Sequence, residues 1–199
     1  MRRFLVFAIS LFISISLFSQ NLDINILKAI NSPNNLRSDN FFKFMSNSDG
    51  EVIVGVPICL GVIGFISNDK EFKINTGGIV LADAINFSLT EILKYSINRP
   101  RPYETYSFIT KKSDGGNPSF PSAHTSASFA TATSLSLAYP KWYIIVPSYA
   151  WASTVAYSRM YLGVHYPSDV IGGIIVGMGS SYIAFKLQKW INKIYLNKS

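Results

Sequence analysis

The sequence predicts an all-α protein, built as a bundle of five to six apolar helices. Of its 199 residues, 48% are hydrophobic and only 15% are charged, whereas soluble domains carry roughly 25% charged residues. Four or five apolar stretches of helical length are separated by turns rich in Pro, Gly, Asn or charged residues. No stretch shows the alternation of apolar and polar residues that is typical of a strand. The length suits one domain.

The first 19 residues favour a secretory signal peptide, with a first membrane helix as the alternative. Met1-Arg2-Arg3 precedes an apolar run from Phe4 to Phe18, and cleavage is expected near Ser19. The run is short for a membrane span, which needs about 20 residues. Residues 20–50 are expected to form an amphipathic surface segment of two short helices broken at 32–35. Residues 51–193 are expected to form the helical domain.

Within that domain, helices are predicted over about 52–66, 74–97, 122–138, 142–157 and 168–190. Asp83, Asn86 and Glu91 indicate that the second of these faces the bundle interior, because polar residues avoid lipid. The single cysteine, Cys59, lies in an apolar run and is interpreted as a small buried residue. Residues 99–121 contain several Pro and Gly and form a long loop, which indicates a functional role.

The net charge of +7 favours a membrane with anionic lipid headgroups as a partner, and not a nucleic acid. If the helices alternate in direction, Arg2-Arg3, Lys70, Lys73, Lys141 and the C-terminal lysines share one side. The positive-inside rule makes that side cytoplasmic. Residues 99–121 and 158–169 then face the periplasm of a bacterial cell envelope, in the inner membrane or as a periplasmic protein after leader cleavage. Whether the helices span the bilayer or pack against it stays open.

Three segments on that outer side carry chemistry. His165 and Asp169 are four residues apart, so they share one face of a helical turn. An Asp that accepts a hydrogen bond from one imidazole nitrogen leaves the other as a base or nucleophile. Arg159, six residues earlier, supplies donors suited to phosphate oxygens. The alternative is that Asp169 only caps a helix.

The second segment, residues 121–124, introduces a helix whose first amides and the Ser122 hydroxyl suit an anion. His124 beside them can donate a proton to a leaving oxygen, although Ser122 can also be a simple helix cap. The third segment places Lys94 and Arg101 on the same side, where they can bind a phosphoryl group. Arg99 is interpreted as a basic side chain that reaches from the helix end to the membrane surface.

Together the patterns Lys-x6-Arg-Pro, Pro-Ser-x-His and Ser-Arg-x5-His-x3-Asp resemble the signature of the type 2 phosphatidic acid phosphatase family, which shares its site with vanadium haloperoxidases. The resemblance covers roughly residues 50–190. It implies a phosphatase that forms a phospho-histidine at His165 and uses no metal or other cofactor. Asp169 would orient His165, and His124 would protonate the leaving oxygen. The resemblance assigns phosphate binding to Lys94, Arg101, Ser122, Ala123 and Arg159. The family usually has Gly where this chain has Ala123, whose methyl group narrows the pocket.

The resemblance and the apolar helices point to lipid phosphates as substrates, either phosphomonoesters or pyrophosphates. The candidates are phosphatidic acid, phosphatidylglycerol phosphate, undecaprenyl diphosphate and lipid A phosphate. Tyr103, Lys111 and Lys112 are candidates for headgroup contact, or they are solvated. Two alternatives stay open, a vanadate-dependent haloperoxidase and a catalytically silent membrane protein of the same fold. The sequence leaves the oligomeric state open.

Overall fold

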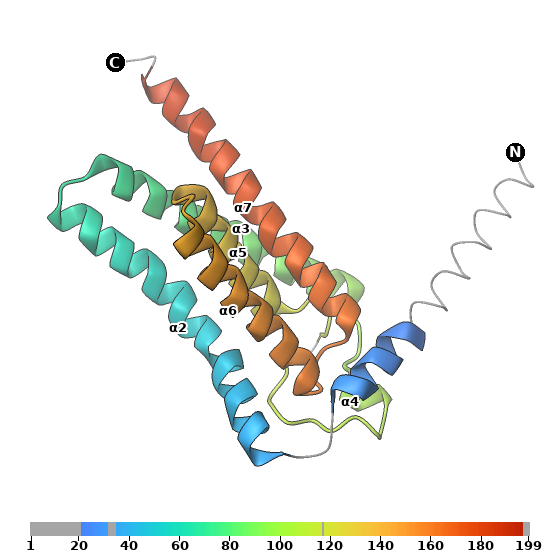
Figure 1. Ribbon diagram of the computed structural model, residues 1–199. Helices are drawn as coiled ribbons and strands as arrows, with labels where there is room; N and C mark the ends of the chain where they lie inside the picture. Colours follow the sequence, from blue (N-terminus) through green and yellow to red (C-terminus); the bar gives the residue numbers. More distant parts are fainter. Residues whose placement is uncertain (1–20, 32–34, 117, 197–199) are drawn as a thin grey trace, which may run out of the picture.

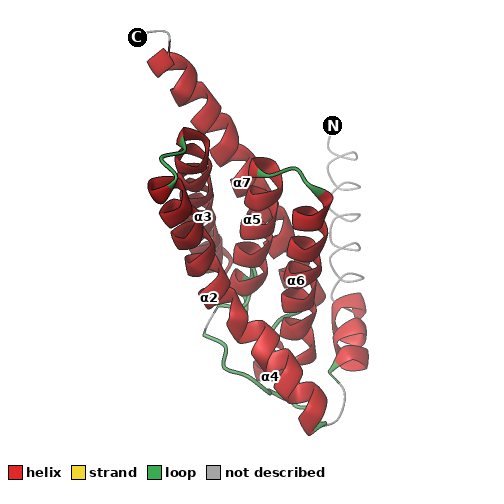
Figure 2. Ribbon diagram, turned by 60° about the vertical axis from the view of Figure 1, so that its left-hand side comes forward, coloured by secondary structure: helices red, strands yellow, loops and turns green. Residues whose placement is uncertain are grey.

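The computed structural model describes residues 21–31, 35–116 and 118–196. The helices are α2 (Leu36–Ile66), α3 (Lys70–Ile97), α4 (Pro102–Thr105), α5 (Ala123–Ala138), α6 (Trp142–Tyr161) and α7 (Pro167–Leu196), and residues 21–30 are also helical (Figure 1). The described residues contain no strand (Figure 2). The prediction of an all-α bundle is therefore confirmed. The expected signal peptide, residues 1–19, lies outside the described residues.

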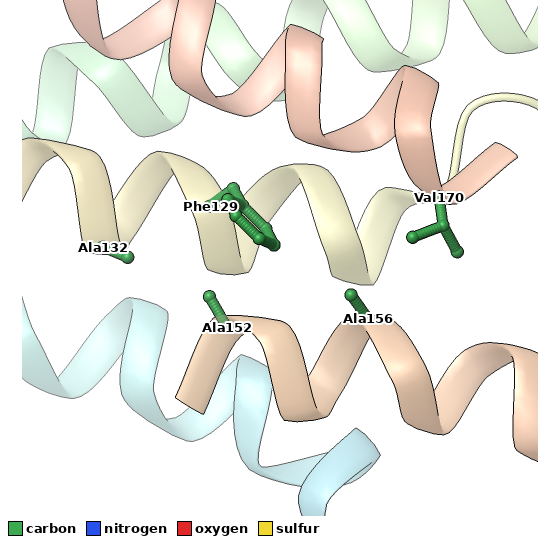
Figure 3. Close-up of a cluster of buried hydrophobic side chains, with 5 residues drawn as sticks. All are labelled: Phe129, Ala132, Ala152, Ala156 and Val170. Atoms are coloured by element: carbon green, nitrogen blue, oxygen red, sulfur yellow. The ribbon is translucent and has the colours of Figure 1, made fainter. Parts of the chain in front are cut away.

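Helix α5 is the centre of the bundle and packs against α3, α6 and α7. Its side chains are small, so neighbouring backbones approach closely. Phe129 and Ala132 of α5 contact Ala152 and Ala156 of α6 and Val170 of α7 in one apolar cluster (Figure 3). On its other side, hydroxyl groups of α5 and α7 hydrogen-bond across the interface, as Ser134 and Ser181 do at 3.0 Å. This tight packing fixes the start of α5 relative to the start of α7, and the site lies between these two helix ends.

Helix α2 begins earlier than the sequence predicts. The first described helix ends at residue 30, and Asn35 caps α2 by accepting hydrogen bonds from the amides of Arg37 and Ser38. From Leu36, however, one helix runs without interruption to Ile66. The second short amphipathic helix expected before residue 50 is therefore the first half of α2, and the domain boundary placed at residue 50 falls inside this helix.

The helices alternate in direction, as the sequence predicts. The α2–α3 turn, the α5–α6 turn and the end of α7 lie at one end of the bundle (Figure 1). Lys70, Lys73 and Lys141 lie there, and the rings of Phe72 and Tyr139 bring the two turns together at 5.5 Å. The loop around α4 and the loop between α6 and α7 lie at the other end. The lysine-bearing turns and the three candidate segments therefore occupy opposite ends.

Three helical segments are long and apolar enough to cross a membrane, Leu36–Ile66, Lys70–Thr105 and Pro167–Ile194. Large apolar side chains such as Phe65, Phe87 and Ile175 are exposed on their outer surfaces. Because water would penalise such a surface, the chain is a membrane protein with lipid around it. Cys59 also lies exposed on α2. The prediction that it is buried is wrong, since apolar residues of a membrane helix face lipid as readily as they face the core.

Candidate active site

The three candidate segments meet at one end of the bundle around a cavity of about 250 Å³. Lys94 comes from the last turn of α3, Arg101 precedes α4, and Arg159 is in the last turn of α6. His124 lies in the first turn of α5, and His165 in the loop before α7. The cavity lining comprises Lys94, Arg101, Ala123, His124, Arg159 and His165, together with Glu91, Asp114, Gly115 and Gly116.

His165 is oriented by Asp169, as the four-residue spacing predicts. Its Nδ1 lies 3.3 Å from Oδ2 of Asp169, and its Nε2 lies 3.2 Å from Nη1 of Arg101. Arg101 can only donate, so Nε2 accepts and the proton resides on Nδ1. Burial, assisted by the charge of Arg101, lowers the pKa of His165 to about 3 even though Asp169 acts in the opposite direction. His165 is therefore neutral at pH 7, with the Nε2 lone pair directed to the cavity side that Arg101 occupies.

Asp169 is completely buried and is held by four donors. Its Oδ2 accepts hydrogen bonds from the Tyr166 amide at 2.9 Å, from Ser119 Oγ and from His165. Its Oδ1 accepts from Arg99 Nη1 at 2.7 Å. The assignment of Arg99 to the membrane surface is therefore wrong. Its guanidinium lies instead between two carboxylates, those of Asp169 and Asp23.

The three cations of the site are buried and hydrogen-bonded mainly to backbone oxygens. Lys94 Nζ donates to Pro118 O at 2.7 Å. Arg101 donates to Val164 O at 2.7 Å and to Gly116 O at 2.6 Å. Arg159 donates to Ser46 Oγ of α2 and, at 3.4 Å, to Asp114 O, and its Nε has no hydrogen-bond partner among the described residues. Three positive charges around one small cavity make it suited to a phosphoryl group.

Helix α5 begins beside this cavity. Ser122 caps the helix, and its Oγ accepts hydrogen bonds from the Thr125 amide at 3.5 Å and from Thr125 Oγ1 at 2.9 Å. The Ser122 amide donates to the Asp169 carbonyl at 3.0 Å, so it ties α5 to α7. Ala123 lines the cavity, whereas Ser122 is fully buried behind it. The structure thus places the start of α5 against the cavity, and Ser122 caps this helix end.

His124 and His165 both line the cavity. Its Nε2 is 3.8 Å from Oδ1 of Asp49, a residue of α2. Burial lowers the pKa of His124 to about 3, and the charges of Arg159, His165 and Arg101 act in the same direction. In the free protein His124 is therefore neutral at pH 7. A bound anion among these cations would reverse part of that effect and favour protonation.

A second, larger cavity of about 700 Å³ shares Asp114, His124 and Arg159 with the first. We call it the vestibule; its other lining residues are Lys43, Asn47, Lys111, Lys112 and Ser113. Of the residues predicted to contact a headgroup, Lys111 is partly exposed, and Lys112 is buried in an ion pair of 2.9 Å with Asp39. Tyr103 lines neither cavity; its hydroxyl donates to Gly115 O at 3.1 Å.

Sequence reasoning missed several residues that contact the site. Ser46 and Asp49 lie on α2, Asp23 in the first described helix, and Ser119 in the loop before α5. None of them stands at a motif spacing from His124 or His165. Their roles arise from the packing of distant segments, for which the sequence alone holds no signal.

Known proteins similar to this chain belong to one family. The PAP2 superfamily model matches residues 76–193, more than half of the chain. A lipid A 4'-phosphatase of Bacteroides thetaiotaomicron is 28% identical over 171 residues, which cover 80% of this chain and 74% of the relative. An undecaprenyl-diphosphatase of Sulfolobus acidocaldarius is 29% identical over 186 residues, which cover 90% and 86% of the two chains.

Two solved structures share the fold. LpxE of Aquifex aeolicus matches with a TM-score of 0.73 and 28% identity over 83% of this chain and 95% of that one. A PAP2-type phosphatidylglycerolphosphate phosphatase of Bacillus subtilis also has a TM-score of 0.73, over 87% of both chains, and its 21% identity supports the fold alone. The matched range contains the three segments that line the cationic cavity. The chain therefore belongs to the PAP2 superfamily and is a phosphatase of that family.

Proposed function

We propose that the protein hydrolyses phosphomonoester or pyrophosphate groups of membrane lipids through a phospho-histidine at His165, without a metal ion. One observation carries the proposal. His165 Nε2 lies at a small cavity with Lys94, Arg101 and Arg159, while Nδ1 is held by the buried carboxylate of Asp169. A neutral imidazole with one nitrogen fixed and the other beside three cations suits nucleophilic attack on phosphorus.

In the first step, the phosphoryl group of the substrate binds to Lys94, Arg101 and Arg159. Arg101 then donates to a phosphoryl oxygen and no longer to His165. The freed Nε2 lone pair attacks phosphorus, and the bond from phosphorus to the leaving oxygen breaks with its electron pair. His124, which takes up a proton when the anionic substrate binds, gives that oxygen its proton. In the second step, His124 removes a proton from water, the resulting hydroxide attacks phosphorus, and the N–P bond returns its electrons to His165. Asp169 stabilises the cationic imidazole ring between the two steps.

The substrate class follows from the surroundings of the site. Exposed apolar helix surfaces place the protein in a membrane, so a substrate with acyl or prenyl chains can remain there while its headgroup enters the vestibule. Relatives are named for lipid A and undecaprenyl diphosphate. We place the polar headgroup against Lys43 and Lys111, because their ammonium groups line the vestibule and neither is buried. Lys112 contributes less there, since Asp39 already holds it.

The site is proposed to face the periplasm. Lys70, Lys73 and Lys141 at the opposite end of the bundle support this orientation through the positive-inside rule. A Ser113→Cys variant in a Cys59→Ser background tests it. We expect a membrane-impermeant maleimide to label this variant in intact cells. Labelling only after the inner membrane is broken would reverse the orientation.

The main test is phosphate release by the purified protein in detergent with EDTA present, using the four candidate lipid phosphates and a soluble phosphate ester. We expect activity on a lipid phosphate and none in His165→Ala. We also expect Lys43→Ala/Lys111→Ala to raise KM for the preferred lipid while KM for the soluble ester is unchanged. An equal rise in KM for the lipid and for the soluble ester would contradict the placement of the headgroup against Lys43 and Lys111.

A second variant separates loss of the nucleophile from loss of the fold. His124→Ala retains the nucleophile, so a substrate with a good leaving group should leave the enzyme phosphorylated. Radiolabelled substrate and an alkaline quench would trap an acid-labile phospho-histidine. Full activity of His165→Ala, or the absence of any labelled enzyme, would refute the mechanism. Halide oxidation with added vanadate and peroxide would favour the haloperoxidase alternative, and failure to bind vanadate would favour a silent protein.

A further inference from the structure

Behind His165, away from the cavity, three charged side chains form a continuous chain of ion pairs. Asp169 Oδ1 accepts from Arg99 Nη1 at 2.7 Å, and Arg99 Nη2 donates to Asp23 Oδ2 at 2.9 Å. The guanidinium also lies over the Tyr166 ring, 3.9 Å from its centroid. Asp23 and Asp169 are both buried, and the Arg99 side chain is 24% exposed. The charges therefore alternate from Asp23 through Arg99 to the carboxylate that holds the nucleophile.

Asp23 has a second set of contacts at the start of α7. Its Oδ1 accepts from the Ser168 amide at 2.8 Å, and its Oδ2 accepts from Ser168 Oγ. The Ser168 amide belongs to the first turn of α7, which holds Asp169 in the next position and whose amides lack partners within the helix. A carboxylate from a distant segment therefore caps the helix that carries the catalytic carboxylate.

The segment that supplies Asp23 is firmly attached. Leu27 of the same helix is fully buried against Ile109 and Tyr166. At its end, Asn31 donates to the carbonyls of Thr110 and Tyr161, each at 3.0 Å, and accepts from the Thr110 amide at 2.8 Å. Asp23 thus reaches Arg99 from a segment with its own fixed position, which suits it to position other groups.

We infer that Asp23, acting through Arg99, is a positioning residue for the proposed reaction. The reason is electrostatic. Attack by Nε2 makes the His165 ring cationic, because Nδ1 keeps its proton, and the negative charge of Asp169 stabilises that ring. Arg99 fixes Oδ1 of Asp169, but on its own it would cancel much of that charge. Asp23 neutralises Arg99, so the three groups together retain one negative charge next to the nucleophile.

The inference rests on the proposed function, and it makes a prediction that differs from that of a folding role. Asp23 does not line the 250 Å³ cavity, so the binding of substrate and of inorganic phosphate should not depend on it. Asp23→Asn retains an oxygen for the Ser168 amide while losing the charge. We expect kcat to fall about tenfold, as is usual when an outer partner of a catalytic group is lost. KM and the inhibition constant of inorganic phosphate should remain within twofold.

Vanadate gives the decisive measurement, because it resembles the transition state. Its inhibition constant should rise in proportion to the fall in kcat, since both depend on a correctly oriented His165. Asp69→Asn is the matched control. Asp69 caps α3 at the opposite end of the bundle, where Asn is an equally good cap. We therefore expect kcat, KM and the inhibition constants of phosphate and vanadate to match those of the wild type.

A double variant tests whether Asp23 acts through Arg99. We expect Arg99→Gln to lose more activity than Asp23→Asn, and Arg99→Gln/Asp23→Asn to lose no more than Arg99→Gln alone. Additive losses would show that Asp23 acts independently. An unchanged kcat in Asp23→Asn would overturn the inference. So would a sample that binds fewer vanadate ions per chain with an unchanged inhibition constant, because part of the protein would then be misfolded and the rest would be normal. Failure of the proposed function would be distinct, because the wild type would then release no phosphate or His165→Ala would remain active.

Discussion

Replacing Gly173 with Ala should push α5 and α7 apart at the active site. A Cβ at this position would lie 2.8 Å from Ser122 O, 3.0 Å from Thr125 Cβ and 3.2 Å from Ser126 N. Two of these atoms are backbone, so no side chain can rotate away. Restoring an ordinary contact of about 3.4 Å requires the first turn of α5 to move by roughly 0.6 Å. The start of α5, which holds Ala123 and His124, would then shift relative to His165.

The change in stability caused by Gly173→Ala combines two opposing effects. Overpacking of a filled interface costs about 1–3 kcal/mol, whereas Ala in a helix is favoured over Gly by roughly 1 kcal/mol. Gly179→Ala isolates the second effect, because Gly179 lies on the same helix and its added Cβ would meet no atom within 4 Å. We therefore expect Gly173→Ala to be less stable than Gly179→Ala by about 2 kcal/mol.

Thermal denaturation in one detergent, together with kcat on one lipid phosphate, measures both consequences. For a chain of this length, the difference in stability corresponds to a melting temperature roughly 4–8 °C lower for Gly173→Ala than for Gly179→Ala. A displacement of about half an ångström should also reduce kcat about tenfold, since misplacements of ~1 Å cost ~100-fold. If the two variants melt together and have equal kcat, the close approach of α5 and α7 is not what positions the site.

Two further predictions concern single residues of the site. A Cβ on Gly115 would lie 2.7 Å from Nη1 and 2.9 Å from Cζ of Arg101, so Gly115→Ala should displace this guanidinium and raise the inhibition constant of phosphate about tenfold. Gly116→Ala, which meets nothing within 4 Å, should stay within twofold, and equal values for both variants would contradict the reasoning. Because burial lowers the pKa of His165 to about 3, the unfolded chain takes up a proton there below pH 6.5 while the folded chain does not. Stability is therefore lost as the pH falls from about 6.5 towards 3, and this residue should account for about 2 kcal/mol between pH 7 and pH 5. His165→Gln should lose correspondingly less stability in melting curves at those two pH values, and an equal loss in both proteins would refute the assignment.

The sequence predicts the placement of those candidate site residues that depend on local spacing. His165 lies just before α7 and contacts Asp169 in its first turn, and Lys94, Arg101 and Arg159 each stand next to a helix end on the same side of the bundle. These placements follow from helix periodicity and alternating helix direction, which a single sequence can show. For this reason the sequence predicts most of the cavity lining, and the residues it does not predict are Glu91, Asp114, Gly115 and Gly116.

What the sequence could not show depends on contacts between distant segments. The polar residues 46–50 suggested the end of a surface segment, yet they lie in the middle of α2, where Ser46 contacts Arg159 and Asp49 lies near His124. Ser46 and Asp49 thus face the site, although the exposed Asn47 and Gly50 lie between or beside them. Arg99 was assigned to the membrane surface for a similar reason, since its partner Asp23 is 76 residues away. In each case the partner becomes known only when the helices are packed.

The hydrogen bonds of the cations in the free protein have a consequence for turnover. Lys94 and Arg101 are already bound to the carbonyls of Pro118, Gly116 and Val164. An incoming phosphate therefore replaces existing hydrogen bonds and does not meet three unsatisfied charges, so its net gain on binding is moderate. The same exchange operates in reverse when inorganic phosphate departs, because the carbonyls accept the cations again. For the proposed reaction we therefore expect only weak inhibition by inorganic phosphate, the product, which carries the same charged group as the substrate.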